Sequence, residues 1–167
     1  VERAWVRFYG LRMSTQPMNK AERIEAYVKS FDLAAEGFDP CYLAYFVCFN
    51  TQEYYEAHDV LEHLWLQRED ENHAFFKGLI QLAGAFVHLK KQSVRPWHPT
   101  DGRRMRPAVR LFALARKNLS PYAPQHMGLD VSEVLGLAAD HVSRIEASGF
   151  SKNPWHPDTA PKLELRY

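Results

Sequence analysis

Apolar residues recur every three or four positions over most of the chain, which is the spacing of helices that bury one face. Ten prolines leave two long windows, residues 41–95 and 125–153, free of the strongest helix breaker. Together these patterns predict helices at residues 20–36, 40–49, 51–68, 73–92, 107–119 and 131–148. The sequence therefore predicts an all-α protein.

The two longest helical patterns, residues 51–68 and 73–92, are separated only by a polar turn. So short a connection favours an antiparallel hairpin, which we expect at the centre of a helical bundle. A length of 167 residues is that of one domain. Its expected parts are an amino-terminal extension with one helix, a bundle core and an extended tail, at residues 1–38, 39–148 and 149–167.

Local signals support these helix starts. Three segments have the shape of capping boxes, in which a side chain accepts a hydrogen bond from the first turn: Asn19-x-x-Glu22, Asn50-x-x-Glu53 and Asp130-x-x-Glu133. Two tetrapeptides of identical sequence, residues 96–99 and 154–157, read Pro-Trp-His-Pro. We expect each to be an extended segment that anchors its tryptophan, Trp97 or Trp155, on the bundle.

Composition narrows the class of protein. Apolar residues make up 46% and charged residues 25%, with a net charge of +1, which is typical of a soluble globular chain. No apolar run is long enough to cross a bilayer, so we expect no membrane partner. No nucleic-acid-binding module is recognisable, so we expect no specific nucleic-acid partner. Cys41 and Cys48 lie two helical turns apart, too far for a disulfide, and no export signal is visible, which favours the cytoplasm.

Polar residues on the predicted helix 51–68 divide between two positions. A helical wheel places Glu56, Asp59 and His63 opposite the apolar stripe, where we expect them to face water. His58 and Glu62 lie four residues apart at the edge of that stripe, where a side chain is half buried. The wheel therefore predicts that this pair converges on one point.

The predicted helix 73–92 has small and polar residues opposite its main apolar face. Gly78 and Ala85 would let another backbone approach closely, and Gln81 and His88 lie on the same side. We therefore expect a central helix buried on two sides, with Gln81 and His88 pointing into a seam between helices.

His58, Glu62, Gln81 and His88 form the candidate site, and three interpretations of it stay open. The pair of His58 and Glu62 could transfer a proton, with Gln81 and His88 orienting a bound group. Alternatively His58, Glu62 and His88 could bind a divalent metal, which is less favoured because a paired Glu-x-x-His pattern is missing. The third interpretation, a buried hydrogen-bond network that fixes helix register, is favoured by the residues alone.

Charge is unevenly distributed along the chain. Residues 90–117 contain nine Lys or Arg against one Asp, whereas residues 53–71 contain seven acids against one Arg. Arginine forks suit phosphate and carboxylate groups, so Arg103, Arg104 and Arg110 form a candidate anion site. The alternative is that these arginines pair with the acidic helix or face water.

One stretch carries a family resemblance. Residues 49–65 read FNTQEYYEAHDVLEHLW and resemble the opening motif of the domain of unknown function 309 family, F-N-x-x-x-Y-[FY]-E-A-H-[DE]-x-L-E-x-x-W. Residues 76–83, FKGLIQLA, and then His88 are similar to its second motif, and Pro107-Ala108-x-x-Leu111 continues the likeness. The resemblance spans about residues 49–119, with weaker agreement to about 147.

The resemblance implies an all-helical bundle and, by its name, no established activity. Carried over position by position, it selects these residues: Glu56, His58, Asp59, Glu62, Trp65, Gln81 and His88. It thus agrees with the wheel at four positions and adds Glu56, Asp59 and Trp65. If Glu56 and Asp59 are functional, either another segment covers their face of the helix or they contact a partner.

Two functional hypotheses follow. The leading one is a small-molecule or anion site between helices 51–68 and 73–92, which could be enzymatic and hydrolase-like. The alternative is a non-catalytic, homo-oligomeric interaction module whose buried polar residues only fix helix register. The ligand, the reaction and any cofactor are not specified by the sequence.

Overall fold

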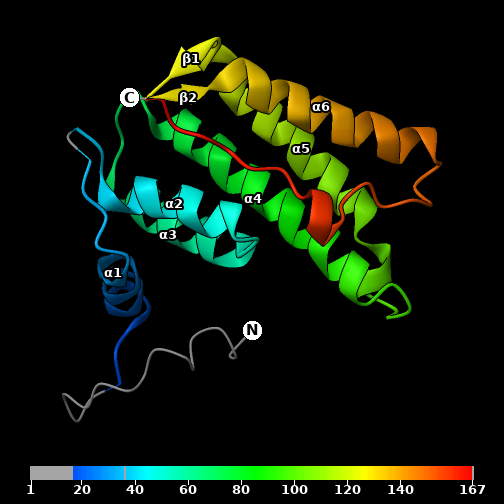
Figure 1. Cartoon of the computed structure of the whole chain (residues 1–167), viewed down its shortest axis with the longest axis horizontal. Coiled ribbons are helices and arrows are strands. Elements are labelled where there is room, and N and C mark those ends of the chain that lie inside the picture. Colours follow the sequence, from blue (N-terminus) through cyan, green and yellow to red (C-terminus); the bar gives the residue numbers. More distant parts are fainter. Residues whose placement is uncertain (1–16, 36, 167) are drawn as a thin grey trace.

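The computed structural model describes residues 17–35 and 37–166 of the chain. These residues form six α-helices (Figure 1), namely α1 (Lys20–Ser30), α2 (Pro40–Asn50), α3 (Tyr54–Gln67), α4 (His73–Val94), α5 (Met105–Leu119) and α6 (Val131–Ala147). A two-residue antiparallel hairpin of β1 (Gln125–His126) and β2 (Leu129–Asp130) precedes α6. The predicted all-α class is confirmed.

Helix α4 is the centre of the packing. Its most extensive contacts are with α5 and α3, while α2 packs on α3 and α6 packs on α5 (Figure 1). Both faces of α4 are buried, since Leu79 and Phe86 on one side and Gly78 and Ala85 on the other are inaccessible or nearly so. The predicted hairpin of two antiparallel helices and the doubly buried central helix are therefore both present.

Two of the three predicted capping boxes cap a helix. Asn19 Oδ1 accepts from Glu22 N at 2.9 Å while Glu22 Oε2 accepts from Asn19 N at 2.9 Å. Asp130 Oδ1 likewise accepts from Glu133 N at 2.9 Å. The prediction for Asn50 was wrong, because this residue ends α2 and the N-cap of α3 is Glu53, which makes no side-chain cap.

Helix α1 is shorter than predicted. The apolar spacing extended to residue 36, but the helix ends at Ser30 and the chain enters the left-handed region at Asp32, with φ 49°. The apolar spacing carries no signal for this end of the helix. Aspartate adopts the left-handed conformation more readily than most residues other than glycine, so Asp32 lets the chain turn away from the helix.

The predicted tail is extended and docks on the helices, running across the bundle in red in Figure 1. The Asn50 side chain bonds both backbone groups of Leu163, at 2.8 and 2.7 Å, and Arg166 N donates to Gly128 O at 2.7 Å. Trp155 is buried and its Nε1 donates to the Tyr54 hydroxyl at 2.9 Å. The amide of Asn50, free of any capping role, thus holds the tail.

The two Pro-Trp-His-Pro segments differ in environment. Trp155 is anchored as expected, at 4% exposure, but Trp97 is 77% exposed, so the prediction that it packs on the bundle was wrong. The shared tetrapeptide does not determine whether its tryptophan is buried. Trp155 packs against Tyr54, which is far away in the sequence and whose ring centre lies 6.2 Å from that of Trp155.

The cysteines and the hydropathy of the helices agree with the sequence patterns. Cys41 and Cys48 are free thiols, as predicted from their spacing. Among the helices of residues 17–35 and 37–166, none combines the length and the apolar character that a membrane crossing requires.

Truncation of the two tryptophans gives a matched test of how the tail is held. We expect Trp155→Ala to lower the free energy of unfolding by about 3–5 kcal/mol, because a buried ring and its hydrogen bond are lost. Trp97→Ala, in the same tetrapeptide, should change it by less than about 0.5 kcal/mol. Urea titration followed by circular dichroism measures both, and similar losses in the two variants would contradict the docked tail.

Candidate functional site

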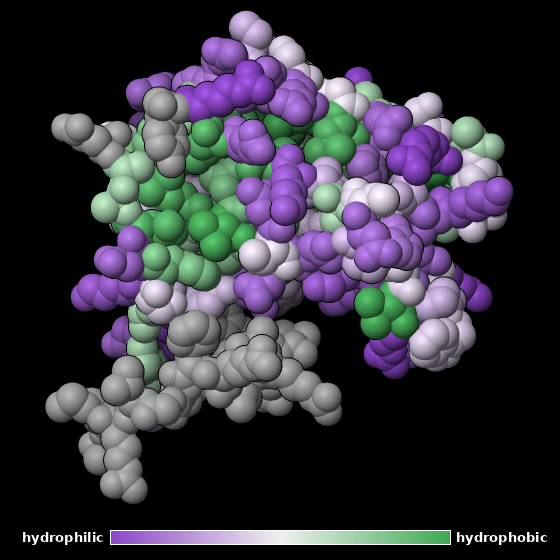
Figure 2. Space-filling model, viewed as in Figure 1, coloured by the Kyte–Doolittle hydropathy of each residue, from purple (hydrophilic) through white to green (hydrophobic). Residues whose placement is uncertain are grey.

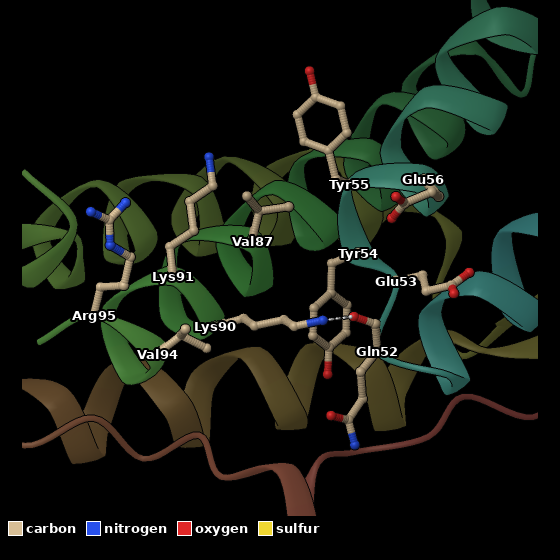
Figure 3. A pocket seen from close by; sticks show the side chains of 10 residues that line it. All are labelled: Gln52, Glu53, Tyr54, Tyr55, Glu56, Val87, Lys90, Lys91, Val94 and Arg95. Atoms are coloured by element: carbon tan, nitrogen blue, oxygen red, sulfur yellow. Dashed lines mark hydrogen bonds between the residues drawn. The ribbon is translucent and has the colours of Figure 1, made fainter. Parts of the chain in front are cut away.

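A cleft of about 420 Å³ lies between the start of α3 and the end of α4. Figure 3 shows its two walls, with acidic groups on the α3 side and basic groups on the α4 side. Buried Tyr54 and half-buried Val87 give it an apolar surface. Its lining residues are Gln52, Glu53, Tyr54, Tyr55, Glu56, Val87, Lys90, Lys91, Val94 and Arg95.

Several charged groups of the cleft are already engaged. Lys90 Nζ donates to the Gln52 carbonyl at 2.8 Å, as the dashed line in Figure 3 marks. Glu53 Oε2 accepts from the Tyr27 hydroxyl at 2.9 Å, and Arg95 pairs with Asp101 at 3.3 Å.

Glu56 and Lys91 line the cleft without such partners. Within residues 17–35 and 37–166, neither side chain has a hydrogen bond or ion pair to another side chain. Burial raises the pKa of Glu56, and the neighbouring carboxylates of Glu53 and Asp59 act in the same direction, against a hydrogen bond from the backbone N–H of Glu56 itself and the charge of Lys90. The wheel placed Glu56 in water, so its predicted full exposure was wrong, because the side chain is half buried where it lines the cleft.

A second polar group lies on α3, where it meets α1. His58 Nδ1 is 3.3 Å from Asp59 Oδ1, and the Lys20 ammonium contacts Asp59 at 3.3 Å and Glu62 at 3.2 Å. Single ligand atoms of His58, Asp59 and Glu62 lie within 4.8 Å of one another. The predicted convergence of His58 and Glu62 is thus present, with Asp59 added.

Asp59 is buried, so its predicted exposure was wrong. Helix α1 covers that side of α3, with Ile24 buried against it and Lys20 reaching the carboxylate. Burial opposes ionisation, but the hydrogen bond from His58 and the charge of Lys20 outweigh it and lower the pKa of Asp59 below its usual range.

Gln81 and His88 belong to the opposite side of α4. Gln81 Oε1 accepts from Asn118 of α5 at 2.7 Å, and His88 Nδ1 accepts from Arg104 Nη1 at 3.2 Å. Both point into a seam between helices, as predicted, but the seam is with α5 and not with α3. Among the described residues, no hydrogen bond or ion pair joins them to His58 or Glu62, so the four predicted site residues divide into separate groups.

The predicted anion site is likewise divided. Arg104 is committed to Asp101, with Nε at 2.8 Å and Nη2 at 2.6 Å, and to His88. Arg103 and Arg110 are exposed. Their proposed pairing with the acidic helix is absent from the ion pairs of the described residues, and Asp101 in the connecting loop takes that role for Arg104.

Trp65, the remaining family-motif residue, closes the turn of the hairpin. Its ring stacks on His73 at 4.7 Å, and its buried Nε1 has no hydrogen-bond partner within the described part of the chain. His63, expected on the surface, has a side chain only 11% exposed, beside Glu25 at 3.4 Å. Lys20 and Asn118 were not identified from the sequence as partners of the candidate site residues. Each is a single polar residue on another helix, and no sequence pattern marks it as a partner.

A scan of family models matches residues 42–98 to one described as Domain of unknown function (DUF309). The match covers the hairpin of α3 and α4 and both quoted motifs, but not the likeness around Pro107. Searches of curated proteins and of solved structures each return no match.

The pH dependence of stability tests the environment of His88. Burial, together with the charges of Arg104, Lys91 and Arg110, lowers the pKa of His88 below its ordinary 6.5. The unfolded chain therefore binds this proton more readily, and the native protein loses stability as the pH falls below about 6.5. We expect His88→Gln, which keeps an acceptor for Arg104, to lose less stability between pH 7.5 and 5.5.

Urea titrations at both pH values measure the difference. His156→Gln is the matched control, because that side chain is 62% exposed, and it should follow the wild-type chain. An identical pH dependence in the wild type and in His88→Gln would contradict the lowered pKa of the half-buried His88 imidazole.

Proposed function

We propose that this chain, a member of the DUF309 family over residues 42–98, binds a small zwitterionic molecule in the cleft between α3 and α4. One observation carries the proposal. The half-buried carboxylate of Glu56 and the ammonium of Lys91 line the same cleft from opposite helices. Among the described residues, neither has a hydrogen bond or an ion pair to another side chain. The proposed site lies between the same two helices as the predicted one, but its binding residues are Glu56 and Lys91.

The cleft has the properties of a ligand site. Its volume falls in the range of about 300–1,000 Å³ that small-molecule pockets occupy. A partly desolvated carboxylate with no cationic side chain bound to it is unfavourable, and a ligand ammonium group would stabilise it. A ligand carboxylate would reach Lys91, and the apolar surface of Tyr54 and Val87 would accept an aliphatic or aromatic side chain. These three requirements together describe a free α-amino acid with an apolar side chain.

The predicted catalytic roles of His58, Glu62, Gln81 and His88, with their hydrolase-like chemistry, stay a prediction. So does the anion-binding role of Arg103, Arg104 and Arg110, of which Arg104 is paired with Asp101. The alternative interaction module is favoured by one observation at the same place, because Tyr55 and Val94 at the cleft are 41% and 59% exposed.

Ligand-observed NMR tests the proposal with leucine and phenylalanine as probes. Each is compared with two analogues that lack one charge, 4-methylpentanoate and 3-methylbutylamine for leucine. We expect the amino acids to bind at least tenfold more tightly than either analogue, because each charge-assisted hydrogen bond contributes about 1.5–3 kcal/mol. Equal signals from leucine and both analogues would contradict a zwitterion site.

Two variants locate the binding. Glu56→Gln and Lys91→Gln should each weaken leucine binding about tenfold or more, whereas Glu146→Gln and Lys117→Gln, on exposed faces of α6 and α5, should not. Because burial disfavours the charged form of Glu56, Glu56→Gln should melt no lower than the wild-type chain at pH 7. Retained binding in Glu56→Gln, or concentration-dependent association abolished by Val94→Ser, would favour the interaction module instead.

A further inference from the structure

The group of His58, Asp59, Glu62 and Lys20 lies outside the proposed cleft, and we propose that it is a divalent transition-metal site. In this site His58, Asp59 and Glu62 are the ligands, and the metal ion takes the place now held by the Lys20 ammonium. The proposal is independent of ligand binding between α3 and α4.

The geometry of the three donors suits a metal ion. All three come from one turn of α3, and their ligand atoms lie within 4.8 Å of one another. Ligands about 2.1 Å from a tetrahedral ion are roughly 3.4 Å apart. Modest side-chain rotations of the half-buried His58 and Glu62 about the buried Asp59 would therefore close the site.

Lys20 shows that a cation is already favourable at this point. Its ammonium lies between two carboxylates, 3.3 Å from Asp59 and 3.2 Å from Glu62, so the group still carries one excess negative charge. The Lys20 side chain is 57% exposed and begins the first turn of α1, so it can move into water without disturbing the core. A divalent ion would neutralise both carboxylates where one ammonium cannot.

A cavity beside this group offers an independent indication. It has a volume of about 210 Å³ between α1 and α3, and Lys20, Asp59 and Glu62 are among its lining residues. His63 also lines it, but its Nε2 is already paired with Gln67 at 2.9 Å and lies 3.4 Å from Glu25, so we do not count it among the ligands. His58 does not line this cavity, so the ion would lie at its edge, and the cavity leaves room for a water molecule to complete the coordination.

The donor types indicate which ions bind. An imidazole nitrogen favours Zn²⁺ and other first-row ions, whereas Ca²⁺ and Mg²⁺ prefer sites made of oxygen alone. We therefore expect Zn²⁺ to bind with one equivalent per chain and Mg²⁺ to compete weakly.

The test titrates the full chain, after treatment with a chelator, with ZnCl₂ in a calorimeter. Native mass spectrometry gives the stoichiometry. His58→Gln and Glu62→Gln should weaken Zn²⁺ binding more than tenfold, while His63→Gln, beside the three ligands, should weaken it less. Circular dichroism checks that each variant is folded.

Lys20 provides the decisive comparison. Lys20→Gln removes the competing ammonium and should tighten Zn²⁺ binding roughly two- to fivefold, the factor that corresponds to an ion pair made by a solvent-exposed lysine. Lys29→Gln, an exposed lysine on the same helix, should leave the affinity unchanged. Equal affinities in the wild type, His58→Gln and Lys20→Gln would overturn the site and show adventitious binding elsewhere on the chain. Glu56→Gln should still bind Zn²⁺, which separates this result from failure of the cleft.

Discussion

The close approach of α5 to α4 is the constraint on which the rest of the structure depends. At Gly78 a Cβ atom would lie 2.6 Å from Leu119 Cγ and 3.3 Å from the Ala115 carbonyl oxygen, so only glycine fits without a shift. Because α5 sits this near, α4 is buried on two faces and its other side is left to pack against α3. A central helix held in this way fixes the position of α3, which carries most of the polar residues of interest.

The two candidate sites follow from where α3 is covered and where it is open. At its first turn, α3 and the end of α4 diverge and leave the cleft of Glu56 and Lys91. One turn further, α1 crosses α3 and supplies Lys20 to the carboxylates of Asp59 and Glu62. The surface of the molecule on the side shown in Figure 2 mixes polar and apolar areas, and its continuous apolar area lies toward α2. Both candidate sites are thus on α3, one beside α4 and the other beside α1.

The sequence predicted the elements better than the contacts. Helical periodicity and proline positions located the six helices, and the small residues of α4 predicted its burial on two sides. A wheel describes one helix at a time, however, so it could not show that α1 covers Asp59 or that Glu56 is half buried. For the same reason Gln81 and His88 were assigned to the α3 seam, since nothing local specified Asn118 and Arg104 as their partners. The Asn50 signature was ambiguous because an amide that can cap a helix can equally bind a distant backbone, here that of Leu163.

One substitution tests the central constraint most directly. Gly78→Ala should lower the free energy of unfolding by about 1–3 kcal/mol, because the added methyl group meets Leu119 and the backbone of Ala115. Gly136→Ala, on the exposed face of α6 where an added methyl group would meet nothing within 4 Å, should raise it by up to about 1 kcal/mol. Opposite signs in urea titrations of the two variants are the result we expect. Equal stabilisation by both substitutions would contradict the close packing of α4 and α5, and with it the placement of α3.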